Sequence, residues 1–505
     1  MKKFLFVASF LSVFSLPSFS QTVSDVLRYS ALNPGGTARF MGAGGAFTAL
    51  GAEFGAISQN PAGLAMFRRS EVMFSPSMRF TNIGAALPDE SAYNETGSRF
   101  GFDNFGIVFH TTPMSRTNNR RNARIDDEAR GWSTLNVGIG MNRRASFGQA
   151  VFYEGTARGS IMNSFYDDAV ATLNAGGTLD DLYPFTSGLA WDAEALYKDK
   201  NGLLSYDFIE TPNAPVKRSH AVNTFGRMNE MELSVAGNYE EKLMIGASLG
   251  VPMLNYRLEG EYRESDPTDS VSFFDNLTYT ELLRTEGFGI NAKFGIIYRA
   301  TQNFRIGASV HTPTRLGLTD RYSNTFEYNY TDGKGPHSSG VLESSEGNVD
   351  YRLVTPWRVN VGMAALAKNI GFISADVEVV DYGNNRYNLD ANVPNADLAR
   401  DERALNSAIQ RAYKQAVNIR VGGEATLQAL RLRAGVNMMG KPQEGENGFN
   451  FAYSAGIGVR KESFFVDLGY RRTQRNSIVS AYVNGPAAET NVVANDVVLT
   501  LGFKF

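Results

Sequence analysis

The sequence predicts an all-β fold: a transmembrane antiparallel β-barrel of fourteen strands, with an N-terminal hatch plugging its lumen and helical extracellular insertions. Apolar residues alternate with glycine, small polar and charged residues over stretches of about 9–11 residues or more, enough to span a bilayer. The 505-residue chain begins with a secretory signal, and no apolar run behind it is long enough for a transmembrane helix. A water-soluble sandwich, whose apolar faces would meet in a core, is the alternative.

The first twenty residues indicate export. Residues 1–20, MKKFLFVASFLSVFSLPSFS, have the charged start, apolar centre and small-x-small end of a signal peptide. We therefore expect the mature protein to begin at Gln21; a retained anchor is the alternative, although the apolar stretch is short for a helical span. The absence of cysteine excludes disulfides, and a formal net charge of −3 provides no basic excess for binding nucleic acid.

Residues 21–69 precede the first predicted strand and are interpreted as the hatch. Their stretch NPGGTARFMGAGGAFTALGAEFGAISQNPAGLAMF combines many glycines with recurrent apolar residues. Glycine permits tight backbone and close approach of chain to chain, and irregular backbone is tolerated where protein shields it from lipid. We expect a short helix within 22–32. A disordered periplasmic arm is the alternative, against which the apolar content argues.

Two groups of residues in this segment are candidates for function. Asn60, Pro61 and Ala62 are expected to form a turn, because Pro61 fixes its own φ and Asn60 can hydrogen-bond nearby backbone. We expect this turn to govern passage; a purely structural turn that seats the plug is the alternative. The candidate walls of a hydrophobic pocket are Phe40, Phe47, Phe54 and Phe67.

The barrel is predicted over 70–505, and the alternation is clearest at the C-terminus. There Val497, Leu499, Leu501, Phe503 and Phe505 share one face, and the chain ends on an aromatic residue. The candidate strands begin near residues 71, 101, 132, 146, 228, 242, 286, 303, 350, 370, 415, 429, 449, 463 and 494. Their number is odd, whereas single-chain bacterial barrels have even numbers. We therefore interpret 132–157 as one interrupted strand.

That interruption, at Asn142, Arg143, Arg144 and Ala145, is the candidate break in the wall. Successive side chains of a strand point to opposite faces, so two consecutive arginines cannot both face the lumen unless the strand bends or ends. A short turn at the membrane edge is the alternative. Because a charge facing lipid costs about 2–4 kcal/mol at the midplane, other strand charges are predicted to face inward: Arg358, Arg420, Arg431, Arg433, Arg471, Glu232, Glu424 and Asp467.

Two insertions, 158–227 and 388–414, carry helix-forming residues and are predicted to be extracellular.

A G-x-S-x-G match at 246–250 and a G-x-G-x-x-A match at 287–292 lie within alternating strands, where the nucleophile turn or phosphate-binding helix cannot form. The four histidines are far apart in the sequence. We therefore predict no catalytic residue, no metal site and no cofactor, and we do not expect an enzyme.

The glycine-rich lead, the stretch QNPAGLA and the strands that follow resemble the FadL/TodX family of outer-membrane transport proteins. NPGGTARFMGAGGAF resembles the form found in Bacteroidetes. The resemblance implies fourteen strands, a lumenal hatch, and hydrophobic substrates such as long-chain fatty acids or aromatic hydrocarbons. It also implies a third strand that kinks inward and opens the wall sideways, at the place of 142–145. The long helical insertions depart from the family's simplest form.

These observations predict a monomeric channel in the bacterial outer membrane for passive uptake of hydrophobic small molecules. The expected partners are the substrate, outer-membrane lipid and the barrel assembly machinery, which would recognise the last strand ending at Phe505. No nucleic acid is expected as a partner. One alternative, implied by some Bacteroidetes relatives, is a barrel scaffold for protein secretion or surface attachment. Haem uptake is another, although no clear axial-ligand arrangement is found.

Overall fold

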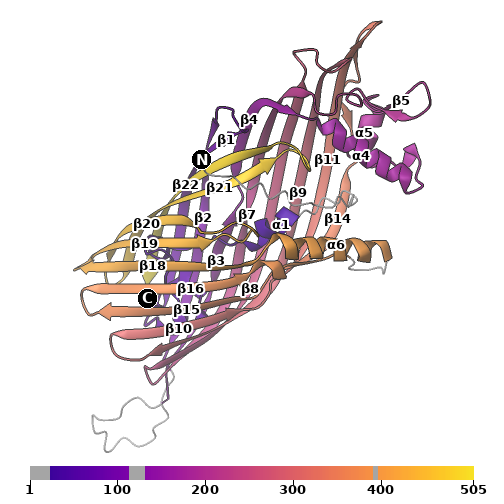
Figure 1. Ribbon diagram of the computed structural model, residues 1–505. Helices are drawn as coiled ribbons and strands as arrows, with labels where there is room; N and C mark the ends of the chain where they lie inside the picture. The colour runs from indigo at the N-terminus through magenta and orange to yellow at the C-terminus, as the bar shows by residue number, and fades with distance from the viewer. Residues whose placement is uncertain (1–22, 34, 113–130, 390–395) are drawn as a thin grey trace, which may run out of the picture.

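A closed antiparallel barrel dominates the computed structural model shown in Figure 1. The structure describes residues 23–33, 35–112, 131–389 and 396–505, so the predicted signal peptide 1–20 and the predicted periplasmic connection 112–131 lie wholly or mostly outside the described residues. Within these ranges fourteen wall strands follow one another, and β1 (Glu71–Ala86) pairs with β22 (Ala487–Lys504) to close the ring. The predicted fold class and strand number are confirmed.

The other twelve wall strands follow the chain order around the ring, and several are interrupted. They are β2 (Tyr93–Thr111), β3 (Trp132–Ser146) with β4 (Gln149–Arg158), β7 (Pro215–Tyr239), β8 (Leu243–Ser265), β9 (Phe274–Arg299), β10 (Phe304–His311) with β11 (Arg315–Asp332), β14 (Gly347–Val354) with β15 (Arg358–Ala367), β16 (Gly371–Asp381) with β17 (Arg386–Asn388), β18 (Gln415–Leu427), β19 (Leu430–Gly440), β20 (Phe449–Arg460) and β21 (Phe464–Ser480). Because β3 and β4 both pair with β7, they are two parts of one strand, as the even number required.

One side of the barrel is much taller than the other. Strands β7, β8 and β9 have 25, 23 and 26 residues, whereas β15, β16 and β19 have 10, 11 and 11. The tall strands β7 and β9 begin at Pro215 and Phe274 rather than near 228 and 286. Their first halves escaped the sequence analysis because the outward residues there are largely polar, so the alternation no longer has an apolar face.

The outer face carries an apolar belt with a sharp upper edge. On β8, Ile245 and Met253 face outward and are 43% and 39% exposed. Directly above them Asn255 pairs with Arg227 of β7 and Glu286 of β9, which makes a polar row across three strands. An outward apolar belt bounded by polar residues is the lipid-facing surface of an outer-membrane barrel.

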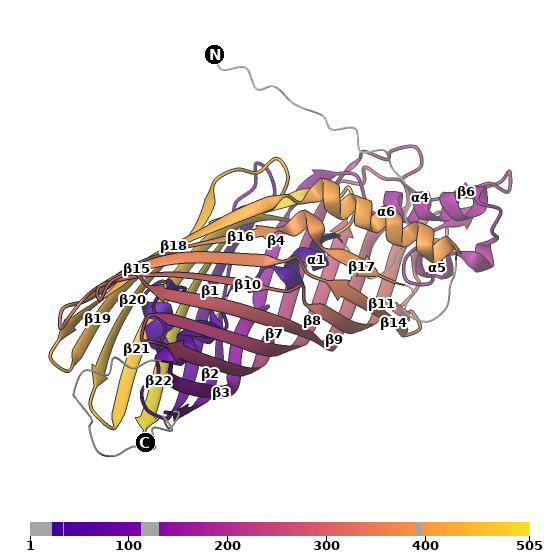
Figure 2. The same cartoon turned by 90° about the horizontal axis from the view of Figure 1, so that it is seen from below.

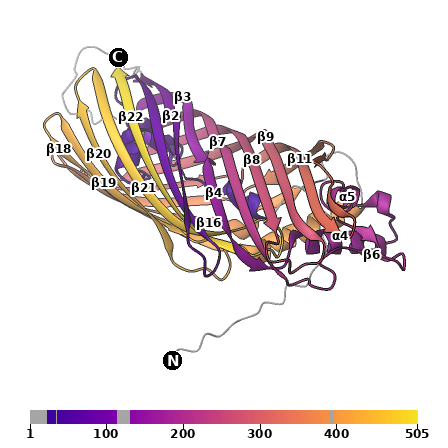
Figure 3. The same ribbon diagram turned by 90° about the horizontal axis from the view of Figure 1, so that it is seen from above.

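The insertions lie at the end of the barrel opposite the C-terminus (Figures 1 and 3). The first contains α4 (Ile161–Asn174), η2 (Leu179–Asp181), α5 (Ser187–Asp192), β5 (Tyr197–Lys198) and β6 (Leu204–Ser205), and the second contains α6 (Ala396–Ala412) after η3 (Tyr382–Asn384). Two further short strands, β12 (Gly335–Ser338) and β13 (Leu342–Glu343), pair with β11. Helices form in both insertions as predicted. Among the helices of the described residues, none is long and apolar enough to cross a membrane.

Residues 23–69, called the N-terminal segment below, run inside the ring of strands (Figure 2). The segment contains α1 (Val23–Ser30), which is the short helix expected within 22–32, then α2 (Ala38–Gly42), α3 (Phe54–Ile57) and η1 (Pro61–Met66). Most of its residues from 35 to 67 are buried. Tyr413, which follows α6, donates a hydrogen bond to the Val23 carbonyl of α1 at 3.0 Å, so the second insertion contacts α1.

Candidate functional site

The wall accommodates the N-terminal segment at inward-facing glycines. A Cβ atom at Gly106 would lie 2.6 Å from the Phe54 ring, and one at Gly246 would lie 2.5 Å from the Pro61 carbonyl. Other wall glycines that face the segment closely are Gly138, Gly140, Gly295, Gly307, Gly362, Gly422, Gly435 and Gly469. These glycines let the segment contact strands around most of the ring, because no side chain separates the two backbones.

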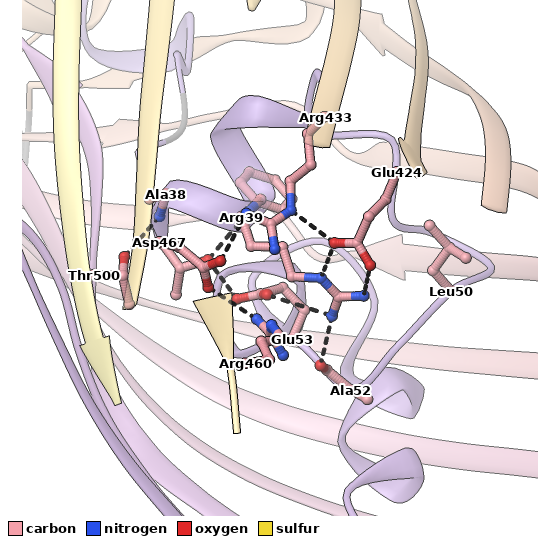
Figure 4. Close-up of polar contacts among 12 residues, drawn as sticks. Ala38, Arg39, Leu50, Ala52, Glu53, Glu424, Arg433, Arg460, Asp467 and Thr500 are labelled. Carbon is pink, nitrogen blue, oxygen red and sulfur yellow. Dashed lines mark hydrogen bonds and ion pairs between the residues drawn. The ribbon is translucent and has the colours of Figure 1, made fainter. Parts of the chain in front are cut away.

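An alternating row of charges anchors the segment to the short side of the barrel (Figure 4). Arg39 of α2 pairs with Glu424 of β18 at 3.0 Å. Arg433 lies between Glu424 and Asp467, at 2.7 Å from each, and Arg460 pairs with Asp467 at 3.0 Å. Each buried charge therefore has an opposite neighbour, which offsets the cost of its burial.

The strand charges predicted to face the lumen do so, and that prediction is confirmed. Arg431 is half-buried, shares the face of Arg433 two residues along β19 and donates to the Gln428 carbonyl at the turn. The others are buried on the inner face: Arg358, Arg420, Arg433, Arg471, Glu232, Glu424 and Asp467.

The predicted turn at Asn60, Pro61 and Ala62 opens η1 and presses against the wall. The side-chain amide of Asn60 donates to the Thr48 carbonyl at 2.7 Å and to the Ile296 carbonyl of β9 at 3.2 Å. Its side-chain oxygen accepts the backbone N–H of Ala62 at 3.0 Å. One side chain thus joins two parts of the N-terminal segment to the barrel, and the turn cannot move without breaking buried hydrogen bonds.

The structure does not bring the four predicted pocket phenylalanines together. Phe40 and Phe47 pack at 5.7 Å between ring centroids, and Phe372 of β16 completes that cluster at 5.8 Å from Phe47. Phe54 and Phe67 belong to a separate cluster that includes Met73, Val108 and Phe465 of the wall. All four phenylalanines are buried, because their rings pack into the space between the N-terminal segment and the wall. Phe40 also borders a smaller cavity that Arg420 and Asn437 help to line.

A larger cavity lies between α1 and the wall. Its apolar lining includes Tyr29 and Leu32 of the N-terminal segment with Met228 and Leu316 of the wall. Its charged lining is Arg144, Glu230, Lys293 and Arg358. These charges are paired. Glu230 forms ion pairs with Arg144 at 3.2 Å and with Lys293 at 2.6 Å, and Arg358 pairs with Glu378 at 3.3 Å.

An apolar cluster continues from this cavity toward the end of the barrel that carries the insertions. Tyr29 of α1 packs edge-on against Phe147 and Tyr256, at 5.9 and 6.0 Å between centroids. The cluster also includes Leu254, Leu318, Leu353, Leu405 and Ile409. The alternation pattern did not reveal this apolar part of the lumen, because inward apolar residues and outward polar residues alternate there with the opposite phase from the membrane belt.

The candidate wall break at Asn142–Ala145 coincides with a β-bulge. Along β3 and β7, Arg143 opposes Asn229 and Ala145 opposes Met228, so Arg144 is the extra residue. The bulge lets both arginines turn inward, with 6% and 5% of their surfaces exposed. Arg143 then pairs with Asp103 of β2 at 2.8 Å.

The ladder between β2 and β3 also stops at this point. It runs from Thr111 opposite Leu135 to Asn104 opposite Asn142. Beyond it, the carbonyls of Arg143 and Arg144 accept hydrogen bonds from Gly35 N–H at 2.8 Å and Asn33 N–H at 3.0 Å, in the N-terminal segment. Strand β4 pairs with β7 and, within the described residues, has no ladder to β2. We call the boundary between β2 residues 93–103 and the β4–β7 pair the seam.

Comparisons with known proteins identify the architecture. No protein-family model matches the chain, and no curated protein sequence matches it. Solved structures do: a FadL homologue from Pseudomonas aeruginosa (TM-score 0.52, 12% identity) and the Pseudomonas putida toluene transporter TodX (TM-score 0.51, 13% identity), each covering 94% of this chain and 99% of its own. The chain has the fold of FadL and TodX. This fold and the apolar belt place the barrel in the outer membrane.

A third similar structure is a TodX deletion mutant titled as a monoaromatic hydrocarbon channel, with a TM-score of 0.51, 13% identity, and coverage of 93% of this chain and 98% of that one. At these identities the likeness concerns the fold. The resemblance seen in the glycine-rich lead and the strands is therefore confirmed at the level of architecture. Within the described residues no cluster of three or more metal-binding side chains occurs.

Sequence reasoning missed several residues that connect the N-terminal segment to the wall. Arg39 and Glu53 are lone charges in a glycine-rich apolar stretch, which was a usable sign of buried partners of opposite charge. Ser58 is another: its hydroxyl donates to Glu232 at 2.9 Å and accepts from Asn142 at 2.7 Å. No local pattern distinguished this serine, because its partners are more than eighty residues away.

Proposed function

We propose that the chain carries hydrophobic small molecules passively across the outer membrane, with the N-terminal segment as a hatch and the seam as a lateral route. The solved structures similar to it are titled as a toluene transporter, a FadL homologue and a monoaromatic hydrocarbon channel. One observation carries the proposal: Arg144 lines the larger cavity and is also the bulged residue where the β2–β3 ladder has stopped. A binding space thus adjoins the discontinuity in the wall.

The chemistry of the cavity favours ligands with a large apolar surface. Its charged groups already have partners of opposite sign, so they need no charge from a ligand. Tyr29, Leu32, Met228 and Leu316 give the rest of the lining an apolar character, and removing a ligand's apolar surface from water yields about 25 cal/mol per Å². We expect alkylbenzenes and the hydrocarbon tails of fatty acids to bind there, with a polar head directed to hydrogen-bonding groups at the rim.

The proposed hatch and the wall break share hydrogen bonds. Asn142, at the end of the ladder, donates to Ser58 and also to Glu232, at 2.7 and 3.1 Å. Ser58 lies two residues before Asn60, in the turn that seats η1. A ligand that displaces Arg144 or α1 would therefore disturb one connected set of contacts that reaches both the turn and the seam. This coupling supports the role proposed for Asn60, Pro61 and Ala62.

The proposal also includes recognition of the C-terminal strand by the barrel assembly machinery. Phe505 is 69% exposed at the end of β22, and its N–H donates to the Ser70 carbonyl at 2.9 Å. An exposed terminal aromatic residue at a barrel edge supports recognition by the barrel assembly machinery before closure. We propose that the folded chain works as a monomer, because the cavity and the seam are formed within one barrel.

A disulfide between the β1–β2 turn and β4, at the outer edge of the seam, tests the route. The native chain has no cysteine. A Cβ at Gly155 of β4 would lie 2.7 Å from Cγ of Glu90, so Glu90→Cys with Gly155→Cys brings two Cβ atoms close to the span of a disulfide, about 3.5–4.5 Å. The matched control is Thr81→Cys with Gly97→Cys, which joins β1 to β2 where a ladder already exists.

Uptake of labelled toluene and of labelled oleate is measured in cells that lack another hydrophobic channel. We expect oxidised Glu90→Cys/Gly155→Cys to lose most uptake and to regain it after reduction, while the control pair transports in both states. Equal uptake in the oxidised and reduced seam pair would contradict the lateral route. No uptake of either probe by the native chain, with the barrel at the surface, would contradict the channel and favour a scaffold role.

A further inference from the structure

Arg99 of β2 makes contacts across the seam where no ladder does. It lies opposite the buried Arg79 in the β1–β2 register, so its side chain leaves β2 on the inner face. Its Nη2 donates to the Thr224 carbonyl of β7 at 2.9 Å. Its guanidinium carbon also lies 4.5 Å from the centroid of the Phe225 ring. One flexible side chain thus bonds and stacks on the strand at the far side of the seam.

The break between β3 and β4 makes room for this side chain. Phe147 and Gly148 separate the two strands. A Cβ atom at Gly148 would lie 2.5 Å from Nε of Arg99 and 2.7 Å from its Cδ and Cζ. Glycine is therefore the residue that allows the guanidinium to reach β7, and any larger residue would push the arginine out of the seam.

Arg99 differs from the other inward arginines nearby. Arg79 pairs with Asp496 at 2.6 Å, and Arg143 pairs with Asp103 at 2.8 Å, both in buried surroundings. Among the described residues, no carboxylate lies within ion-pair distance of Arg99, which is only partly buried. Its contacts are a carbonyl and a ring, so releasing it leaves no buried carboxylate without a partner. Arg99 can therefore leave its partners at a lower cost than these paired arginines.

We propose that Arg99 is the latch of the seam: it holds β2 against β7 when the route is empty and swings off Phe225 when an apolar molecule passes. The inference rests on the proposed function for its role in transport. A hydrophobic molecule in the seam covers the Phe225 ring, which is the surface that the guanidinium must vacate. On the outer side, Phe100, Phe102 and Phe105 of β2 are 66%, 38% and 43% exposed, so the apolar path from Arg99 to the lipid-facing belt follows β2 rather than crossing the polar row of β7. Arg99 therefore acts as a positioning residue for the route.

The latch is tested by measuring the width of the seam directly. Cysteines replace the exposed Ser98 on β2 and Asn223 on β7, and nitroxide labels on them report the distance across the seam by pulsed electron resonance. The same labels on Asn82 and Asn491 report the closed β1–β22 boundary. The test variants are Arg99→Ala, which removes the latch, and Gly148→Ala, which displaces it while leaving Arg99 in place. Arg99→Lys keeps the charge and loses the planar group that stacks.

We expect both alanine variants to add a longer-distance population across the seam, about tenfold larger than in the native chain, since each loses a hydrogen bond to a charged group. Arg99→Lys should be intermediate, and the β1–β22 distances should not change in any variant. Barrel folding is checked by heat-resistant migration in detergent gels. Identical seam distances in the native chain, Arg99→Ala and Gly148→Ala would overturn the latch.

Measuring uptake in the same variants distinguishes the role of Arg99 as a latch from the existence of the lateral route. If the seam widens in the alanine variants and uptake of labelled toluene rises, the latch is supported together with its role in transport. If the seam widens and uptake is unchanged, the latch stands and the lateral route fails. If the seam does not widen while the oxidised Glu90→Cys/Gly155→Cys pair still blocks uptake, the route stands and Arg99 is not its latch.

Discussion

The closing boundary between β1 and β22 and the seam between β2 and β4 form a contrast. The ends of the chain meet at the first boundary, where pairing runs from Glu71 opposite Lys504 to Ala86 opposite Glu489, interrupted only around the bulge at Ser75 and Pro76. At the second, strands that are neighbours in sequence lose their ladder above Asn104. Strands that are neighbours in sequence are therefore not always joined by a continuous ladder in this wall.

The two boundaries also differ in how they hold charge. At the closing boundary Asp496 accepts Arg79 of β1 at 2.6 Å and Arg471 of β21 at 3.0 Å, so one carboxylate ties three strands together. At the seam Asp103 pairs with Arg143, whose carbonyl is bonded to the N-terminal segment rather than to β2. Ion pairs between wall strands hold the β1–β22 boundary together, whereas the seam depends on hydrogen bonds to the N-terminal segment inside the barrel.

The largest expected effect is at the closing boundary. Asp496→Asn would leave buried arginines without their shared carboxylate, and breaking a buried ion pair costs about 3–5 kcal/mol. We expect a clearly lower unfolding temperature in detergent, measured by the loss of heat-resistant gel migration. Asp103→Asn at the seam should lower that temperature less, because Arg143 still has Asp496 at 3.8 Å. Equal losses in the two variants would remove the proposed difference between the boundaries.

A smaller effect is expected where the N-terminal segment replaces the missing ladder. A Cβ at Gly35 would lie 2.7 Å from a carboxylate oxygen of Asp103 and 3.3 Å from Cβ of Arg143. Gly35→Ala should therefore cost about 1–3 kcal/mol through overpacking. Hydrogen exchange should accelerate at residues 142–146. Gly317→Ala, where the nearest atom is 3.9 Å away, is the matched control. Unchanged exchange at 142–146 would show that the segment does not support the seam.

The smallest effect on stability and the most specific effect on transport are expected at the turn. Loss of a capping side chain costs about 0.5–2 kcal/mol, so Asn60→Ala combined with Pro61→Ala should leave a barrel that assembles and resists heat in detergent gels. Uptake of labelled toluene should fall, because the turn no longer transmits changes between the cavity and the seam. Full uptake at normal surface levels would leave the turn with a structural role only.

Much of the fold was predictable because the alternation that encodes it is local. Leu499, Leu501 and Phe503 face outward on β22, as their spacing indicates, and the same rule located most wall strands. The even number of strands and the pair Arg143–Arg144 predicted an irregularity near 142–145; the structure has a bulge at Arg144, and the gap between β3 and β4 follows at Phe147 and Gly148. The sequence also indicated a buried, irregular lead from its mixture of glycine and apolar residues.

Only the tertiary structure decided which residues meet. Phe40 and Phe54 have the same local character, yet Phe54 packs over the wall glycines Gly106 and Gly140, whereas Phe40 joins a cluster with Phe47 and Phe372. Nothing in the sequence near Arg99 indicates that its side chain reaches Thr224, since that contact depends on β4 ending its pairing with β2 and on the space at Gly148. Alternation determines the face on which a side chain lies, whereas its partner across the lumen or the seam depends on register and curvature, which arise only when the ring closes.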